Sequence, residues 1–389
     1  MRIKDIIQSI EQLAPVPLQE DYDNSGIQVG DVNREATGAI LAIDVTENVI
    51  DEAISLGCNL IISHHPMIFR PFKSLIGRNY IERCILKAIK NDTYLILIGD
   101  VDQLPPVGAG NCLSDIIKSS RFEVCRLKKI FRQAQESLIV VNAHKINDRI
   151  MPILDVKDSD FFFIKRESAE DIKELVIDLA ARRLPRKYKV DFLDDIQIIT
   201  PTRKGELGTN ELNKVLQSAL NPQDGKKKEK KFGSIIFREG DKIMQIKNNY
   251  DLEWSALSES DSGNDEENKG RGIFNGDIGR ILSINTQSET MVIDFDKRIT
   301  EYDFALLEEL VHAYAITVHK SQGSEYKIVM MPAFDSPAPL MTKNLLYTAV
   351  TRAKEMVCII GRARCIETMV KNDRRPVRHT ALGEFLCSI

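Results

Sequence analysis

The segment AYAITVHKSQGSEY (313–326) holds the densest set of side chains in the chain that could bind phosphates. Its apolar residues alternate as in a strand, and they lead into Thr317, His319, Lys320 and Ser321 just before a glycine. Hydroxyl, imidazole and ammonium groups donate hydrogen bonds to phosphate oxygens and to the edges of bases. The pattern therefore predicts a site for phosphates or bases at the end of a strand.

Two arginines have the setting of groups that stabilise charge. The spacing in LLYTAVTRAKE (345–355) predicts a helix with Thr348, Thr351 and Arg352 on one face, opposite an apolar face of Leu345, Leu346, Ala349 and Val350. That placement would let Arg352 stabilise charge in phosphoryl transfer. In IFRQ (130–133), Arg132 follows an apolar pair, and it either faces a cleft between domains or lies on the surface.

Two further segments follow apolar strands, where α/β folds place groups that contact ligands. In GDVDQLPPVGAG (99–110), Asp100 and Gln103 would reach a phosphate or a water, or the segment is a simple turn. In TPTRKGELGTNELN (200–213), two glycines precede a new helix. Such a turn offers backbone N–H groups to a phosphate, or it is an ordinary link between a strand and a helix.

The elements around these segments predict an α/β fold. The runs 39–45 and 58–65 have the pattern of buried strands, and residues 45–57 between them that of a helix ending in glycine, which together predict a βαβ unit. A further strand is expected over 93–98. A helix is expected over 168–184, capped by Ser168, and an amphipathic one over 1–13.

After Leu220 the pattern changes to short strands separated by turns, such as Asn-Gly at 275–276. We expect a loop over 221–231 and then a small β-barrel inserted in the α/β framework. The acidic, polar stretch 255–271 is expected to be a mobile loop. Trp254 is expected to pack in the barrel rather than to stack on a base.

Composition limits the class of protein. Hydrophobic residues at 43% and charged residues at 28% allow packed cores, and a net charge of −4 does not by itself indicate a nucleic-acid partner. No apolar run approaches the roughly 18 residues of a membrane span, so no membrane partner is expected. The charged amino terminus is not that of a secretory signal. Seven cysteines without a CxxC pair indicate reduced thiols in a cytoplasmic protein.

In this order, the five segments resemble the later motifs of RecD-like superfamily 1 helicases, which move 5′ to 3′ on single-stranded DNA. The resemblance covers about 93–389. It implies catalytic roles for Gln103, Arg132 and Arg352, which would contact the γ-phosphate or couple it to DNA. It places Asp100, Gly323 and Glu325 toward the nucleotide, and it implies ATP and Mg²⁺ as cofactors. The DNA-binding residues that it implies are Thr202, Thr317, His319, Lys320 and Ser321. REGDKIMQIKNNYD and GIFNGDIGRI resemble an SH3-like barrel.

The sequence lacks the GxxxxGK[ST] loop, whose backbone N–H groups and lysine hold the phosphates in such motors. An Asp-Glu pair for Mg²⁺ is also missing, because Asp51-Glu52 has a helical setting and lies too far upstream. We therefore expect a helicase by descent that binds single-stranded DNA and hydrolyses ATP poorly. A non-catalytic DNA-binding module is an alternative.

EDYDNSGIQVGD (20–31), residues 42–69 and KAIKND (87–92) resemble the dinuclear-metal family known as GTP cyclohydrolase I type 2-like or NGG-interacting-factor-like. The resemblance implies that His64 and His65 bind divalent metal. The rest of the family's site is missing, since His379 and Glu384 have the wrong spacing. A metal-dependent hydrolase is thus a second alternative, with an incomplete metal site.

The two resemblances meet at 87–93, which predicts a chimeric fusion that arose either in the genome or in sequence assembly. We expect the strand at 93–99 to complete the open sheet edge of the N-terminal fragment. The expected parts are the fragment at 1–92, a remnant of a first RecA-like domain at 93–165, a second RecA-like domain at 166–224 and 311–389, and the barrel at 225–310.

Overall fold

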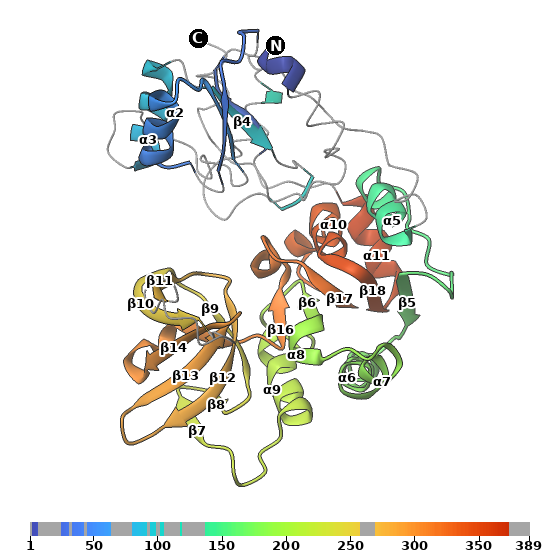
Figure 1. Cartoon of the computed structure of the whole chain (residues 1–389). Coiled ribbons are helices and arrows are strands. Elements are labelled where there is room, and N and C mark those ends of the chain that lie inside the picture. The colour runs from blue at the N-terminus through green and yellow to red at the C-terminus, as the bar shows by residue number, and fades with distance from the viewer. Residues whose placement is uncertain are drawn as a thin grey trace. The chain divides into compact units, whose positions relative to one another are not determined.

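The computed structural model describes residues 2–6, 25–30, 33–42, 45–63, 80–91, 94–98, 102–104, 117–118, 137–256 and 269–372. The chain divides into two units, one of Met1–Val141 with Asp373–Ile389 and one of Asn142–Asn372. Figure 1 shows the helices and strands of both units and labels many of them. No helix within the described ranges is long and apolar enough to cross a membrane. The cysteines that are described are free thiols, buried except for Cys58: Cys58, Cys84, Cys358 and Cys365.

The first unit contains a four-stranded sheet in the order β1-β4-β3-β2. Strand β3 pairs in parallel with β2 and β4, and β1 pairs antiparallel with β4. The strands are β1 (Ser25–Val29), β2 (Ala39–Ala42), β3 (Leu60–Ser63) and β4 (Tyr94–Ile98), and the helices that pack beside them are α2 (Glu47–Ser55) and α3 (Tyr80–Lys90). Strand β4 therefore completes the sheet of the N-terminal fragment, as the sequence predicts.

The predicted βαβ unit is confirmed in β2, α2 and β3. Thr46 Oγ1 accepts a hydrogen bond from the Val49 N–H at 3.3 Å and so caps the first turn of α2. Ile50 and Ala53 face inward and share a core with Ile61 of β3. Residues 3–6 of the predicted N-terminal helix are helical, and the remainder of that prediction lies outside the described residues.

The second unit contains a five-stranded parallel sheet in the order β16-β6-β17-β18-β5. Its strands are β5 (Phe161–Lys165), β6 (Ile196–Thr200), β16 (Ala315–Thr317), β17 (Tyr326–Ala333) and β18 (Ala353–Gly361). The α/β class with a parallel sheet is thus confirmed. Strand β5 was missed by the sequence analysis, although its aromatic run Phe161–Phe163 between polar stretches is a strand signal.

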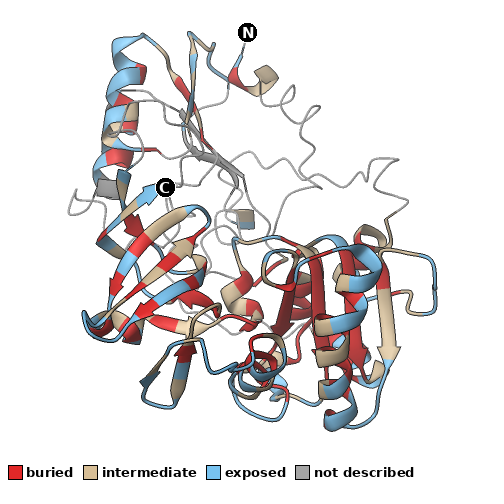
Figure 2. Ribbon diagram, turned by 60° about the horizontal axis from the view of Figure 1, so that its bottom comes forward, coloured by how far each residue is buried: buried red, intermediate tan, exposed pale blue. Residues whose placement is uncertain are grey.

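Helices cover both faces of this sheet, and the strands between them are buried (Figure 2). Ile328 and Met330 of β17 share a core with one set of helices. Val329 and Met331 alternate with them, are also buried, and point to the opposite face, where α10 and α11 contact β17. The first set is α6 (Ala169–Asp178), η3 (Leu179–Arg183), α7 (Leu184–Tyr188), α8 (Phe192–Asp195) and α9 (Thr209–Leu220), and the second is α10 (Lys343–Thr351) and α11 (Ala363–Lys371), with α5 (Leu138–Asn147) preceding β5.

Local signals account for the ends of several helices. Ser168 Oγ accepts a hydrogen bond from the Asp171 N–H at 3.0 Å, so the predicted cap of α6 is confirmed. The predicted helix over 168–184 is confirmed, although its hydrogen-bond pattern is π-helical over Leu179–Arg183 before the chain continues as α7. Pro185 follows this π-helical segment, and proline within a continuous helix removes one backbone hydrogen bond.

Between β6 and β16 the chain forms a seven-stranded antiparallel sheet in the order β11-β10-β14-β13-β12-β9-β15. Met291, Ile293 and Phe295 of β13 alternate with more exposed residues and face one core, against which Trp254 packs. The elements are β9 (Lys242–Gln245), β10 (Asn249–Ala256), β11 (Lys269–Ile273), β12 (Ile278–Asn285), β13 (Thr290–Phe295), β14 (Arg298–Asp303), η4 (Phe304–Glu309) and β15 (Leu310–His312), preceded by the hairpin β7 (Glu229–Phe232) and β8 (Ile235–Arg238).

Two loop predictions in this region need correction. The loop expected over 221–231 ends earlier, because Glu229–Lys231 pair with β8. Both ends of the mobile loop expected over 255–271 belong to strands instead, since Ser255 of β10 pairs with Lys269 of β11. The interior of that expected loop, 257–268, lies outside the described residues.

A fully buried carboxylate, Asp241, lies where the antiparallel sheet joins the parallel one. Asn221 Nδ2 and the Tyr314 hydroxyl donate to its Oδ1 at 2.7 and 2.8 Å. Gln217 Nε2 and the Arg238 N–H donate to its Oδ2, both at 2.7 Å, and His312 Nε2 lies 3.1 Å from the same oxygen. A buried carboxylate is strongly unfavourable unless it is hydrogen-bonded, and here both oxygens are saturated.

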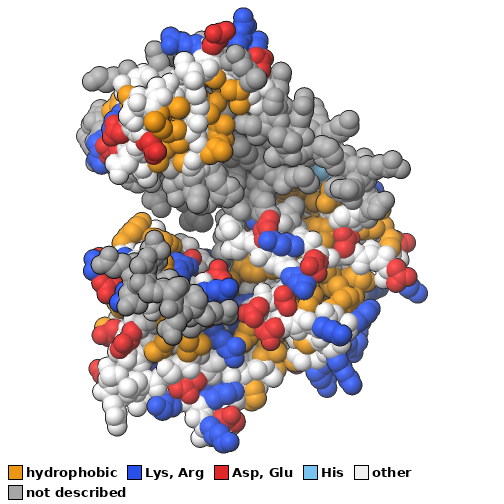
Figure 3. All heavy atoms as spheres, viewed as in Figure 1, with side chains coloured by type: hydrophobic (Ala, Val, Ile, Leu, Met, Phe, Trp, Pro, Cys, Tyr) orange, Lys and Arg blue, Asp and Glu red, His pale blue; other side chains and the backbone are white. Residues whose placement is uncertain are grey.

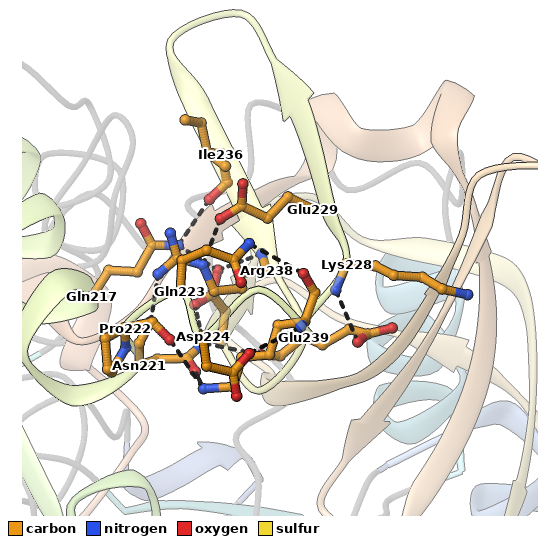
Figure 4. A network of polar contacts seen from close by, with 12 residues as sticks. Gln217, Asn221, Pro222, Gln223, Asp224, Lys228, Glu229, Ile236, Arg238 and Glu239 are labelled. Carbon is orange, nitrogen blue, oxygen red and sulfur yellow. Dashed lines mark hydrogen bonds and ion pairs between the residues drawn. The ribbon is translucent and has the colours of Figure 1, made fainter.

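Figure 4 shows how the end of α9 holds the hairpin that follows it. Arg238 Nε donates to Glu229 Oε1 at 2.6 Å, and its Nη1 donates to the Asn221 carbonyl oxygen. Gln217 Nε2 donates to the Ile236 carbonyl oxygen at 2.8 Å, and Asn221 Nδ2 reaches the Glu239 carbonyl oxygen at 3.1 Å. These contacts continue the Asp241 network onto β7 and β8.

Replacing Asp241 tests the importance of this junction. We expect Asp241→Ala to lower the free energy of unfolding of the second unit by about 3–5 kcal/mol, because it leaves several buried donors without an acceptor. Urea unfolding followed by the fluorescence of Trp254, the only tryptophan, measures the change. The control Asp251→Ala, at an exposed position of β10, is expected to change stability by no more than about 0.5 kcal/mol. Equal effects of the two substitutions would contradict the assignment.

Lys242, the next residue, carries a buried amine between the two sheets. Its Nζ donates to the Ile196 carbonyl oxygen at 3.1 Å and lies 5.6 Å from the centre of the Phe192 ring. Burial lowers the pKa of Lys242 to about 8, although the charges of Asp194, Asp191 and Asp195 oppose the shift. Burial prevails because a buried ammonium loses its hydration, while these carboxylates attract it without contacting it.

Lys242 makes stability depend on pH in a defined window. Its folded pKa is lower than that of an unfolded lysine, so its stabilising contribution is complete above about pH 10.5 and is lost as pH falls to about 8. The difference is at most about 3 kcal/mol. We expect Lys242→Met to remove this rise and to be at least as stable as the parent at pH 7. Urea unfolding of both proteins from pH 7 to 10.5 measures it, and parallel pH profiles would contradict the expectation.

Candidate nucleic-acid interface

The parallel register brings two of the predicted segments to one edge of the sheet. Strands β6 and β16 end level with each other, since Thr200 pairs with Thr317. The loop 201–208 and the turn η5 (Val318–Ser321) therefore both leave from the carboxyl edge. Thr202 from the loop, and Thr317, His319 and Lys320 from β16 and η5, are thus brought together as the sequence analysis requires.

Close packing fixes the shape of the 201–208 loop. Thr200 Oγ1 donates to the Leu207 carbonyl oxygen at 2.8 Å, and Thr202 Oγ1 donates to the Lys204 carbonyl oxygen. A Cβ atom at Gly208 would lie only 2.5 Å from the Lys204 carbonyl oxygen, so the loop can turn into α9 only with glycine there. The Thr202 hydroxyl is therefore partly occupied by its own loop.

Asn213 holds the two segments in place. Its Nδ2 donates to the Ala315 carbonyl oxygen at 2.9 Å, and its Oδ1 accepts from the Ala315 N–H at 2.8 Å. The buried amide thus pairs with β16 as a neighbouring strand would, and it fixes α9 beside that strand. Sequence reasoning missed this residue. Its signal was the helical spacing that places it on the same inward face as Leu212 and Leu216.

Lys320 is the central cation of this edge. Its Nζ donates to Asn275 Oδ1 of the antiparallel sheet at 2.6 Å. Burial and the nearby charge of Arg203 both lower the pKa of Lys320. Neither cation forms an ion pair with any residue that the structure describes. Two neighbouring cations without a carboxylate partner are suited to a phosphate, which would relieve their repulsion.

The other hydroxyl of this segment has a different environment. Ser321 is fully buried, and its Oγ donates to the Val318 carbonyl oxygen at 2.8 Å within η5. It therefore closes the turn that presents His319 and Lys320. Sequence reasoning did not identify Arg203 or Asn275 as members of this edge, because their link to Lys320 depends on chain segments that are distant in sequence.

The residues expected near the nucleotide form a second group. Arg352 is fully buried, and its Nη1 donates to the Ser324 carbonyl oxygen at 3.3 Å. Lys354 Nζ lies 2.6 Å from Glu325 Oε2, and Gly323 beside them is exposed. This group lies at the amino ends of β17 and β18, whereas Lys320 lies at the carboxyl end of β16. The short segment 322–325 connects the two groups.

The burial of α10 differs from the prediction of an apolar and a polar face. Thr348 and Arg352 are as fully buried as Leu346 and Val350. The helix contacts the sheet, η5 and α11, so little of its surface is left for solvent. Thr348 is tolerated there because its hydroxyl donates to the Asn344 carbonyl oxygen at 2.8 Å. Arg352 is therefore enclosed within the unit rather than placed on an open polar face.

The remaining predicted residues belong to the first unit. Gln103 is buried, with 2% of its surface exposed. Asp100, Arg132 and the two histidines of the predicted metal site, His64 and His65, lie outside the described residues, as do His379 and Glu384. Strand β3 ends at Ser63, directly before the histidines. Within the described part of the chain, no three metal-ligating side chains lie together.

The surface charge of the second unit is mixed. On the face shown in Figure 3, basic and acidic side chains are interspersed over its described surface. This agrees with the net charge of −4. Any selectivity for an anionic polymer therefore depends on local cations such as Lys320 and Arg203.

A mixed α/β architecture, with a helix-covered parallel sheet and an antiparallel insertion, is the class that these features define. The model of the Duf34/NIF3 (NGG1p interacting factor 3) family matches residues 1–291, and that of the UvrD-like helicase C-terminal domain matches residues 312–360. The chain belongs to the Duf34/NIF3 family and joins it to a UvrD-like helicase C-terminal segment. The two resemblances inferred from the sequence are thus confirmed.

Relatives of two kinds are similar to this chain. The chain is 30% identical over 301 residues to the ATP-dependent RecD2 DNA helicase of Deinococcus radiodurans, which covers 77% of this chain and 37% of that protein. It is 44% identical over 95 residues to a GTP cyclohydrolase 1 type 2 homolog of Clostridium perfringens, or 24% of this chain and 36% of that one. The chain thus spans little more than a third of either relative.

A solved structure is similar along most of the chain. The Pif1 helicase from Bacteroides, in complex with ADP-AlF3 and ssDNA, is 17% identical, with a TM-score of 0.43 over 99% of this chain and 96% of that one.

The metal content of the chain tests the predicted histidine pair. Two adjacent histidines are fewer than the three or more protein ligands of a tight site, so we expect fewer than about one equivalent of divalent metal per chain. Elemental analysis of the purified protein after dialysis with Zn²⁺ or Mn²⁺ measures it, with His64→Ala/His65→Ala as the control. Two equivalents that this double variant loses would support a dinuclear hydrolase instead.

Proposed function

We propose that the second unit is a RecD-like helicase motor domain by descent, and that it binds single-stranded DNA at the carboxyl edge of β6 and β16. The observation that carries the proposal is the pair of cations at this edge, Lys320 and Arg203, with the hydroxyl groups of Thr202 and Thr317 beside them. In this proposal 225–310 form an SH3-like barrel, and 166–224 with 311–389 form the motor domain.

The electrostatics of Lys320 support a phosphate ligand. Its amine is half-buried and close to a second cation, so an anion bound there would interact more strongly than at an open surface. The hydrogen bond from Lys320 to Asn275 holds the amine in one position. Contacts of this kind bind the DNA backbone without reading its sequence. We therefore infer weak binding that is independent of sequence and sensitive to salt.

The nucleotide side is incomplete. By resemblance, Arg352, Gly323, Glu325, Asp100, Gln103 and Arg132 would face ATP and Mg²⁺. An arginine that stabilises the transition state contributes roughly 10³–10⁵ in rate, but it cannot hold the phosphates and the metal. The sequence has no GxxxxGK[ST] loop, and the described residues contain no cluster of metal ligands. The residues present therefore do not fit a complete ATP site, and we infer that this chain hydrolyses ATP poorly.

The alternative of a non-catalytic DNA-binding module shares the same edge. Both hypotheses, the helicase motor domain and the non-catalytic module, require Lys320 for DNA binding, and they differ only in whether the chain hydrolyses ATP. The alternative of a metal-dependent hydrolase depends on the first unit, where the Duf34/NIF3 match and the cyclohydrolase homologue give it support. Its metal requirement is independent of Lys320, so the two kinds of function can be tested separately.

Binding of a fluorescent oligo(dT) by the full chain tests the proposal. We expect the affinity for oligo(dT) to fall steeply between about 50 and 300 mM salt, because cations that bind DNA phosphates displace counterions, and added salt opposes that displacement. Lys320→Ala is expected to weaken binding and to reduce the slope of log Kd against log salt by about 0.7, the loss of one phosphate contact. Fluorescence anisotropy measures both.

The matched control is Lys327→Ala, because Lys327 is partly exposed near Asp195 at the opposite edge of the sheet. It should leave binding unchanged. ATP turnover is measured in parallel with and without DNA. Robust DNA-stimulated turnover would contradict the inferred loss of hydrolysis, and absence of salt-sensitive binding would contradict the DNA-binding proposal itself.

A further inference from the structure

Two large aromatic side chains are exposed on the antiparallel sheet. Tyr250, in β10, is 65% exposed, and Phe274, just after β11, is 39% exposed. Their rings contact each other edge to face, with centroids 5.6 Å apart and an interplanar angle of 68°. Exposed apolar groups that gather in one place mark an interaction surface more often than single ones do.

A chain of hydrogen bonds connects this aromatic pair to Lys320. Lys320 Nζ donates to Asn275 Oδ1 at 2.6 Å, and Asn275 directly follows Phe274. The Asn275 N–H donates to Asn248 Oδ1 at 2.9 Å, and Asn248 Nδ2 donates to the Tyr250 hydroxyl at 3.2 Å. The aromatic pair is thus the immediate neighbour of the proposed DNA-binding edge.

The Phe274 ring is held in position by its surroundings. A Cβ atom at Gly272 would lie 2.7 Å from Phe274 Cζ, so the ring packs directly over that glycine. The Phe274 N–H donates to Asp277 Oδ2 at 2.9 Å, and Arg298 Nη2 donates to the same oxygen at 2.9 Å. The pair therefore presents its surface without first having to order a flexible loop.

We propose that Tyr250 and Phe274 form a base-stacking platform that extends the DNA-binding edge from Lys320 onto the antiparallel sheet. The inference rests on the proposed DNA-binding function. Aromatic faces beside a cationic groove are the combination that binds single strands, because unstacked bases offer a π-face while their phosphates contact the cations. A duplex hides those faces within its own stack. The platform is therefore selective for single strands and tolerant of sequence.

Comparison of two ligands with equal backbone charge isolates stacking. The full chain is titrated with oligo(dT) and with an abasic oligomer of the same length, which keeps the sugar-phosphate backbone and lacks the bases. We expect Tyr250→Ala/Phe274→Ala to weaken oligo(dT) binding by about 5- to 100-fold and to change binding of the abasic oligomer by no more than about twofold. Lys320→Ala is expected to weaken binding of both ligands.

Matched variants keep the result interpretable. Tyr188→Ala removes a tyrosine of α7 that is 37% exposed, about as exposed as Phe274, and distant in sequence from the edge, so it should leave both titrations unchanged. Tyr250→Phe/Phe274→Tyr keeps two aromatic rings and should retain oligo(dT) binding, whereas Phe274→Leu keeps apolar bulk and should lose part of it. Trp254 fluorescence during urea unfolding shows that each variant is folded.

Each outcome decides between the proposals. If the double alanine variant binds oligo(dT) as the parent does, or loses equal affinity for both ligands, the stacking platform is overturned while DNA binding stands. If the parent itself does not bind oligo(dT), the proposed function fails and the platform fails with it. If the aromatic pair affects instead the capture of a protein partner and not oligo(dT), the surface has a different occupant and the platform is overturned.

Discussion

The second unit depends on one buried carboxylate. Asp241 is fully enclosed, and its oxygens receive groups from α9, from the β8–β9 turn and from the chain between β15 and β16. An unpaired charge in that position would be strongly destabilising, so these segments can pack only in the arrangement that saturates it. Since β16 follows directly after Tyr314, the same constraint fixes the strand that delivers Thr317 and Lys320. The site is therefore a consequence of how the antiparallel insertion is attached.

The attachment also explains why one edge combines two kinds of surface. The parallel sheet supplies cations at its carboxyl ends, and the antiparallel sheet supplies Asn275 and an aromatic pair. The hydrogen bond between Lys320 and Asn275 joins them. Arg352 belongs to the opposite edge, where backbone carbonyls and Thr351 surround its guanidinium. Lys320 and Arg352 thus lie at opposite edges of the parallel sheet, with the segment 322–325 between them.

The sheet of the first unit depends on one strand that arrives late in the sequence, β4. Strand β4 pairs in parallel with β3 and antiparallel with β1, so it lies between two strands that precede it in the sequence. An open sheet edge presents unpaired N–H and carbonyl groups that any extended apolar segment can satisfy. Strand β4 satisfies such groups on β3 and on β1. Strand pairing alone does not supply a phosphate loop, because such a loop depends on a particular glycine pattern.

The sequence alone determined the α/β class, several of the helices and strands, and the two family resemblances, but it missed β5. The period-two and helical spacing of apolar residues and the caps at Thr46 and Ser168 are local properties. The spacing within one segment determines which face of that strand or helix each side chain lies on, and a cap contacts the helix that it begins. Only the tertiary structure decided which polar groups meet. Asn213 forms hydrogen bonds with Ala315, which lies 102 residues further along the chain, and Lys320 donates to Asn275, which lies 45 residues earlier. Thr348 and Arg352 are buried, although the helical pattern suggested an exposed face. The physical reason is that a buried polar group needs a partner, and local periodicity carries no information about where that partner lies.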